Sequence, residues 1–287
     1  MSANPVETDS PVEPSERGGN LFGRALGSVM EAGREILARR LPAATAPEGS
    51  PLALTALCRE LLDHRGEASG LALAEKITGA YRQLEPEARL EFFRALATEF
   101  DVDREQVLAA VERYRDDSSH QALSAISHAT EAPRQKLFRR INMAPDGTRT
   151  LVSLRGDLLQ ILRANPELKP VDSDLKHLFI SWFNKGFLEL RNIDWSAPAL
   201  VLEKLIAYEA VHQINGWDDL RGRLRDDRRC FAFFHPAMGN DPLVFVEIAL
   251  TDALPDAIAP LLRQEREPVQ PEQASTVVFY SISNCHP

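Results

Sequence analysis

Hydrophobic residues from about residue 20 to about residue 165 recur at spacings of three and four, which is the period of an amphipathic α-helix. Turn and cap residues divide this stretch: Pro86 stands at a helix start, Asp101 or Asp103 can cap another helix, and Asp146-Gly147 marks a turn. The pattern predicts helices at residues 21–37, 54–62, 71–84, 86–100, 104–114, 122–129, 133–141 and 152–162. With almost no strand signal between them, these helices are typical of an all-helical bundle.

The pattern changes at about residue 170, where strand-like runs alternate with short helical segments. We expect a helix at 175–183, a strand at 187–193, helices at 198–209 and 218–224, strands at 228–234 and 243–250, a short helix at 257–262 and a strand at 275–283. The middle two strands can form a hairpin across His235–Asp241. The last run is apolar and β-branched, which is typical of a buried central strand.

This order predicts an α+β protein with three parts: a disordered tail at 1–19, a helical oligomerisation domain at 20–169, and the first half of an N-acetyltransferase-like (GNAT-like) domain at 170–287. In that fold the fourth strand leads into a glycine-containing loop. The backbone amides of the loop hold the pyrophosphate of coenzyme A at a helix N-terminus.

Composition narrows the cellular compartments and the classes of binding partner that we expect. The net charge of −9 argues against a nucleic-acid-binding surface, and no apolar run is long enough to span a bilayer. The cysteines, Cys58, Cys230 and Cys285, form neither a disulfide framework nor a metal-ligand pattern. We therefore expect a cytoplasmic protein in a reducing compartment, without a membrane or nucleic-acid partner.

Several polar side chains are candidates for chemistry. His235 lies at a strand end beside a turn, where functional residues are common, although a structural histidine before Pro236 is the simpler interpretation. Glu247 stands in an apolar strand, so it points into a cleft, with a perturbed pKa, or it faces an edge or a salt bridge. The backbone of the last strand could pair with the amides of a pantetheine arm at Tyr280, Ser281, Ile282 and Ser283.

Other candidates have simpler interpretations. His120 and His128 lie two helical turns apart but have no further ligands nearby, so no metal site is predicted. Arg139-Arg140 could meet a phosphate, but a salt-bridged surface is the favoured interpretation. Cys285 has no adjacent base and is a weak candidate for a nucleophile.

Long ordered strings from residue 139 to residue 285 resemble the malonyl-CoA decarboxylase family. The strings that carry the resemblance are Arg139–Pro145, Leu178–Leu188, Ile193–Trp195, Glu209–His212, Trp217–Leu220, Asp227–Pro236, Pro242–Glu247 and Val278–Cys285. The helical region before Arg139 is compatible with the helical domain of that family.

The resemblance implies a reaction that converts malonyl-CoA to acetyl-CoA and carbon dioxide without a metal or organic cofactor. Loss of carbon dioxide leaves an enolate, which needs hydrogen-bond donors at the thioester oxygen and an acid that protonates the carbanion. In the family these tasks are linked to a serine in a Ser-Pro-Ile-Pro-Gly-Phe stretch and a histidine in an Asn-Phe-His stretch. Neither stretch occurs in this sequence, so no catalytic residue is predicted here.

We therefore expect a C-terminally truncated family member that has little or no activity alone, although the family itself consists of enzymes. It should form a homo-oligomer through its helical domain. Two alternatives stay open: a non-catalytic oligomerisation module, and an unfolded remnant whose half-sheet exposes an edge.

Overall fold

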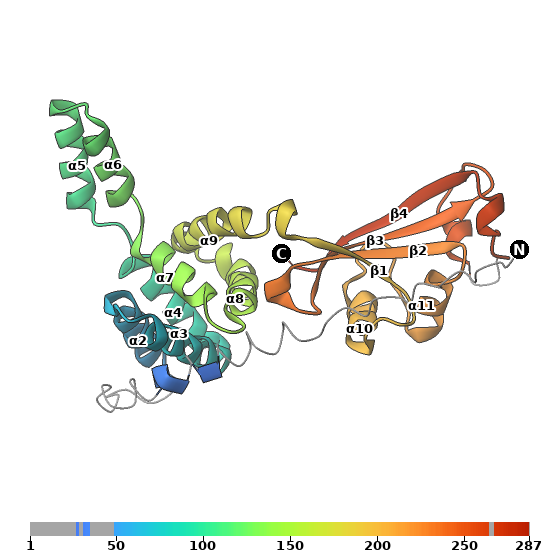
Figure 1. Ribbon diagram of the computed structural model, residues 1–287, viewed down its shortest axis with the longest axis horizontal. Coiled ribbons are helices and arrows are strands. Elements are labelled where there is room, and N and C mark those ends of the chain that lie inside the picture. Colours follow the sequence, from blue (N-terminus) through green and yellow to red (C-terminus); the bar gives the residue numbers. More distant parts are fainter. Residues whose placement is uncertain (1–26, 29–30, 35–48, 264–266, 287) are drawn as a thin grey trace, which may run out of the picture.

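The computed structural model describes residues 27–28, 31–34, 49–263 and 267–286. Within these ranges the helices up to residue 182 form one lobe, and the strands with the helices at 199–208 and 217–223 form a second; the two lobes follow each other along the longest axis of the molecule (Figure 1). The predicted tail and most of the first predicted helix lie outside the described residues. No helix in the described ranges is long and apolar enough to cross a membrane.

The helices of the first lobe follow the predicted order closely. They are α2 (Pro51–Asp63), α3 (Glu67–Arg82), α4 (Pro86–Thr98), α5 (Arg104–Asp116), α6 (His120–Ala129), α7 (Pro133–Asn142), α8 (Gly147–Leu162) and α9 (Lys169–Trp182). Asp103 caps α5 by accepting the backbone N–H groups of Glu105 and Gln106. Gly147 is required at the start of α8, because a Cβ there would lie 2.0 Å from the Ile141 carbonyl oxygen.

One hydrophobic core holds this lobe together. Its largest buried side chains come from α3, α4 and α7, and rings of Tyr81, Phe92 and Phe93 pack against one another. Arg140 lies among them and donates to the carbonyl oxygens of Leu61, Leu62 and His64 at the end of α2. Arg139 pairs with Glu131. Both arginines thus bind protein groups, which agrees with the favoured interpretation that Arg139-Arg140 is structural and does not meet a phosphate.

α9 belongs to the helical core. Val171, Leu175 and Leu178 are buried in the same cluster as the side chains of α3 and α4. The helical lobe therefore continues to about residue 183, and the expected domain boundary at 169/170 falls at the start of α9.

The second lobe is a four-stranded antiparallel sheet in the order β1-β2-β3-β4. Its strands are β1 (Glu189–Ile193), β2 (Arg228–Phe234), β3 (Pro242–Thr251) and β4 (Thr276–Asn284), and α10 (Ala199–Tyr208) and α11 (Trp217–Arg223) lie between β1 and β2 in the chain. β2 and β3 form the predicted hairpin around the 3-10 turn η3 (Pro236–Met238). The combination of a helical lobe and this sheet is the α+β architecture expected.

The two faces of the sheet differ. α10 and α11 cover one face, where Val201, Leu205 and Leu220 meet Ala232 and Phe245 (Figure 1). On the other face, four large apolar side chains are more than half exposed: Leu190 57%, Val277 55%, Phe279 63% and Ile282 61%. In the part of the chain that the structure describes, no helix covers that face.

The position of β4 differs from the prediction. We expected a buried central strand, but β4 is an edge strand among the described residues and pairs with β3 alone. It also contains a bulge: Glu247 pairs with Ser281 and Ile248 with Phe279, which leaves Tyr280 as the extra residue. An apolar run predicts that a strand is suited to burial on both faces. It does not predict which neighbouring strand or helix covers those faces.

The aromatic cluster of the helical lobe can be tested by one substitution. Phe93 is fully buried, so Phe93→Ala should lower the free energy of unfolding by about 3–5 kcal/mol through lost burial and a cavity. Met143→Ala is the matched control, since Met143 is 73% exposed and its loss should cost less than about 0.5 kcal/mol. Urea unfolding monitored by circular dichroism measures both. Equal effects of the two substitutions would contradict the packing described.

Candidate functional site

The inner face of β4 is held by a buried carboxylate. Glu209, just after α10, accepts hydrogen bonds from the Ser281 hydroxyl at 2.8 and 2.9 Å and from the Ser283 hydroxyl at 3.2 Å. The same carboxylate accepts the backbone N–H groups of Val211 and His212 at 2.7 and 2.6 Å. Both serine hydroxyls are therefore committed to Glu209, and what β4 offers to a ligand is its outer edge.

Of the strand's other candidates, Ile282 points to the opposite, uncovered face and Tyr280 points inward. The Tyr280 ring lies 5.6 Å from the Arg223 guanidinium and 5.3 Å from that of Arg228. Burial raises the pKa of the Tyr280 phenol well above its usual range. Tyr280 is thus a neutral, buried ring that packs beside Arg223 and Arg228 on the covered face of the sheet.

Glu247 lies in a buried salt bridge, one of the positions that its sequence allowed. Its carboxylate lies 2.9 Å from Arg223 Nη1, and its side chain is fully buried. Burial raises the pKa of Glu247 to about 7, although the Arg223 guanidinium opposes that rise. Arg223 in turn lies 3.4 Å from Asp219, so the pair extends into a chain of charges between α11 and β3.

Several polar atoms of this charged layer have no direct hydrogen bond, although Arg228 Nε lies 3.7 Å from Asp227 Oδ1. Glu247 Oε1, Tyr280 Oη and two guanidinium nitrogens of Arg228 are buried and make no hydrogen bond within the described residues. A void of about 10 Å³ lies beside Arg223 and Arg228. That is roughly the space of one water molecule, so this void fits water and not a substrate.

A larger cleft, of about 890 Å³, lies between the helical lobe and the carboxyl end of β4. Arg82, Arg89 and Arg149 line its helical side, and Tyr208 and His286 line the side of the sheet. Asp241, at the start of β3, is the point where the two sides meet. It binds Arg149 Nη1 at 2.8 Å, pairs with Lys204 of α10, and lies 3.6 Å from His286 Nε2.

The partners of Asp241 decide its charge. Burial opposes ionisation of the carboxyl, but the Lys204 ammonium and the nearby His286 outweigh burial and lower the pKa of Asp241 to about 2. Arg149 also donates to the Met238 carbonyl oxygen in η3. The cleft therefore contains an ionised acid that joins α8, α10, η3 and the end of β4.

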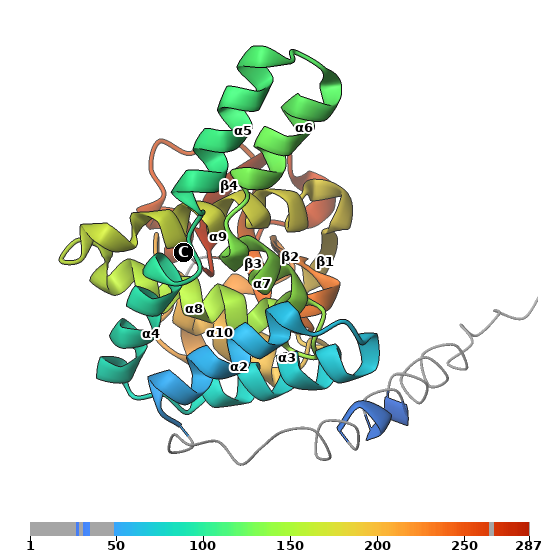
Figure 2. The same ribbon diagram turned by 90° about the vertical axis from the view of Figure 1, so that its left-hand side faces the viewer.

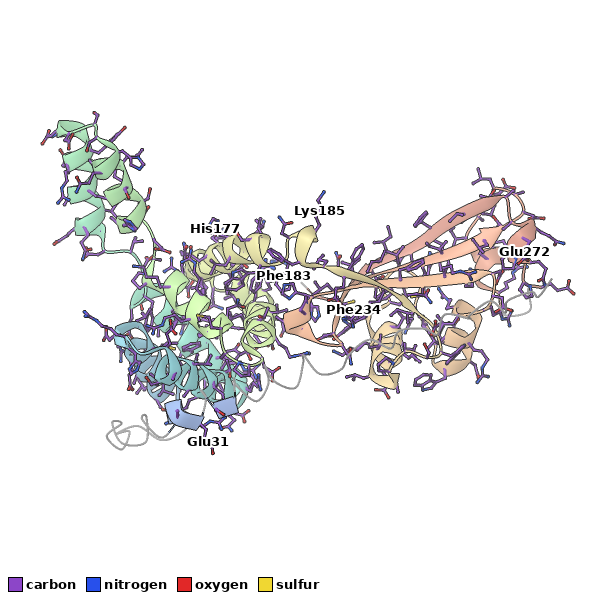
Figure 3. All side chains as sticks on the ribbon, viewed as in Figure 1. Glu31, His177, Phe183, Lys185, Phe234 and Glu272 are labelled. Atoms are coloured by element: carbon purple, nitrogen blue, oxygen red, sulfur yellow. The ribbon has the colours of Figure 1, made fainter. Side chains whose placement is uncertain are left out.

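His235 is remote from the charged layer. Its ring meets Phe183 at a centroid distance of 5.0 Å, and its Nδ1 accepts the Ala237 backbone N–H. Figure 3 shows Phe183 and the neighbouring Phe234 at the junction of the two lobes. Burial lowers the pKa of His235, so it is neutral at pH 7. The structure does not bring His235 together with Glu247 at one site.

The remaining candidates have no chemical partner. Burial raises the pKa of the Cys285 thiol to about 12, so it holds its proton at pH 7. His120 and His128 lie on the continuous helix α6 along a shallow groove with Arg113 and Asp117. Across the described ranges, no group of three or more histidines, cysteines or carboxylates could hold a metal ion.

Glu209 and Asp241 were not among the candidate site residues predicted from the sequence. Glu209 was part of a family string and Asp241 was a turn residue. Neither carried a local signal of its function, because their partners lie 72 and 92 residues away in the chain. The alternation of Ser281 and Ser283 on one strand face was the one local hint that a polar group faces them.

Comparison with known proteins agrees with this geometry. Residues 100–183 match the malonyl-CoA decarboxylase N-terminal domain, and residues 186–287 match the malonyl-CoA decarboxylase C-terminal domain. The chain belongs to the malonyl-CoA decarboxylase family. The boundary between the two matched domains falls where α9 ends and the sheet lobe begins.

Solved structures give the same result. Malonyl-CoA decarboxylase from Rhodopseudomonas palustris is 50% identical with a TM-score of 0.78, covering 82% of this chain and 57% of that one. The enzyme from Agrobacterium vitis is 48% identical with a TM-score of 0.77, covering 81% of this chain and 56% of that one. The mitochondrial malonyl-CoA decarboxylase of Rattus norvegicus is 31% identical over 95% of this chain and 55% of its own length. This chain thus spans a little over half the length of these relatives.

The Glu209 clamp predicts a specific loss of stability. Glu209→Ala leaves two hydroxyls and two backbone N–H groups without their acceptor, so unfolding should become easier by about 3 kcal/mol. Ser283→Ala removes one partner and should cost about 1 kcal/mol. Chemical denaturation measures both. A Glu209→Ala protein as stable as the parent would show that the clamp does not hold β4.

The lowered pKa of Asp241 predicts that the folded protein loses stability at acid pH. Its pKa is lower folded than unfolded, so its stabilisation, about 2 kcal/mol, is present above pH 4 and is lost as the pH falls towards 2. Asp241→Asn should lack this contribution at neutral pH and lose less stability in that window. Asp218→Asn, at an exposed ion pair, is the control and should keep the parent's profile. Thermal melts from pH 2 to pH 7 measure the difference.

Proposed function

We propose that this chain supplies the helical lobe and the substrate-facing strand of a malonyl-CoA decarboxylase, which converts malonyl-CoA to acetyl-CoA and carbon dioxide. The observation that carries the proposal is the match of both family domains, together with 50% identity to a solved decarboxylase. A polypeptide of these 287 residues alone should have little or no decarboxylase activity.

The chemistry of the reaction supports the second part of the proposal. Decarboxylation needs donors aimed at a developing enolate oxygen and an acid that protonates the carbanion. Among the described residues, the hydroxyls of Ser281 and Ser283 are held by Glu209, and Glu247 is held by Arg223. The serine and histidine stretches linked to these tasks in the family do not occur in the sequence.

What β4 contributes is a place for an extended ligand. Among the described residues no strand pairs with its outer edge, and its carboxyl end reaches the cleft that contains Asp241 and His286. A pantetheine arm has amides that can pair with such an edge. The edge beside Tyr280, Ser281, Ile282 and Ser283 therefore stays our proposal for the thioester-binding strand.

Two further points complete the proposal. The three cysteines of the chain are free, which supports a reducing compartment, for which we propose the cytoplasm. The curated relatives are named as mitochondrial enzymes. Assembly into a homo-oligomer through the helical lobe is also part of the proposal, since that lobe exposes apolar helix surfaces.

The test is an activity measurement with an added fragment. The purified 287-residue chain should turn over malonyl-CoA at least about a hundredfold more slowly than a full-length relative, because the proton-transfer groups are absent. Co-expression with the portion of the Rhodopseudomonas palustris enzyme that has no counterpart here should restore turnover. Acetyl-CoA formation is the readout for both.

The uncovered sheet supplies a control for this experiment. Ile282→Lys places a charge on the exposed apolar face and should block restoration, whereas Met143→Lys on the helical lobe should not. Turnover by the chain alone, near that of the full-length relative, would contradict the proposed inactivity. Failure of the fragment to restore any turnover would contradict the proposed role of this chain.

A further inference from the structure

The loop that leads into α11 contains the one asparagine of this sequence that precedes a glycine, in the pair Asn215-Gly216. Ile214 before this pair and Leu220 after it are both buried in the core beneath the sheet. Asn215 itself is exposed between these two anchors. Its side-chain amide donates only a long hydrogen bond, 3.5 Å to the Gln213 carbonyl oxygen. The amide of Asn215 is therefore accessible to water and weakly held.

The backbone at Gly216 has free space around it. Gly216 has a φ of 87°, in the region that favours glycine, and a Cβ built there would meet no atom within 4 Å. The backbone nitrogen of Gly216 is thus not shielded by a side chain of its own residue or by neighbouring atoms. It is also joined through the chain to the Asn215 side chain, and groups linked in this way react as if they were highly concentrated.

We propose that Asn215 is a site of spontaneous deamidation. The Gly216 backbone nitrogen attacks Cγ of Asn215 and forms a five-membered succinimide ring. The bond from Cγ to the side-chain nitrogen breaks, and that nitrogen leaves as ammonia with the proton from Gly216. One water molecule then opens the ring. The sum consumes one water and releases one ammonia, with no change of oxidation state, so the modification needs no further reactant.

The ring can open in two ways. Attack of water at Cγ leaves an aspartate at position 215 with the normal main chain. Attack at the main-chain carbonyl carbon leaves an isoaspartate, in which the main chain runs through Cβ and Cγ and is one atom longer. Both products add one negative charge at the start of α11.

The hydrogen bonds of this loop connect it to the buried charges. The Asp219 carboxylate accepts the Asn215 backbone N–H at 3.0 Å and lies 3.4 Å from Arg223. Arg223 also donates to the His212 carbonyl oxygen at 3.0 Å and pairs with Glu247. A longer main chain and a new carboxylate beside Asp219 disturb these contacts together. The isoaspartate should therefore loosen the Arg223–Glu247 pair, and this effect does not depend on the proposed decarboxylase activity.

Incubation of the purified chain in oxygen-18 water, at pH 7.4 and 37 °C, followed by mass spectrometry of its peptides, tests the first step. The peptide with Asn215 should lose its amide and take up one oxygen-18 atom. Asn240 is the internal control, because it is also exposed in a turn but precedes Asp241, which carries a Cβ. Asn215 should deamidate at least about tenfold faster than Asn240, a barrier lower by about 1.4 kcal/mol. Asn215→Gln should remove the signal.

A thermal melt tests the effect on the fold. Anion exchange separates the deamidated protein by its added charge, and chromatography of its peptides gives the share of isoaspartate. Freshly purified Asn215→Asp is the matched control, since it has the same charge with a main chain of normal length. The isoaspartate-containing fraction should melt about 2–4 °C below this control, which corresponds to the loss of about one hydrogen bond.

Two results would overturn the proposal. Asn215 that keeps its amide for as long as Asn240 would show that the loop does not admit the succinimide. An isoaspartate-containing fraction that melts together with Asn215→Asp would show that the loop is not coupled to the buried charges.

Discussion

Asp241 is the charged residue that joins the helical lobe to the sheet lobe. Among the described residues, the helical core and the core beneath the sheet share no buried side chain, and the Phe183 ring meets the His235 ring at the junction of the lobes. Arg149 reaches from α8 to this buried carboxylate, and Lys204 and His286 reach it from α10 and from the end of β4. Asp241 therefore links α8 of the helical lobe to α10 and to the residues that follow β4.

Charge also organises the covered face of the sheet. Buried ion pairs such as Arg223–Glu247 gain little stability over apolar residues of the same size, because both charges lose their hydration. Their directional hydrogen bonds, however, admit few alternative arrangements. Together with the Glu209 clamp they set the position of β4 on α10 and α11. The apolar residues account for the close packing of this face, and the ionised residues limit it to one arrangement of β4 on α10 and α11.

Much of this architecture could be predicted from the sequence, because the determining signals are local. Helical periodicity, prolines at helix starts and the Asp103 cap act within one or two turns, and α2 to α9 lie close to their predicted positions. Candidate-site residues depend on distant partners instead. Glu247 was recognisable as a charge in an apolar strand, but its partner Arg223 was not. Whether β4 is covered depends on what packs on it, which its own composition does not encode.

The bulge at Tyr280 has a consequence for how β4 can evolve. Side chains on its inner side are held by Glu209 and the arginines, and those on its outer face are apolar, so what its edge presents is main chain. Recognition through main chain tolerates the exchange of individual side chains. Away from the bulge, a change in length is tolerated less well, because inserting or deleting one residue would exchange the two faces of the strand on one side of the change. We therefore expect β4 to tolerate substitutions more readily than insertions or deletions outside the bulge at Tyr280.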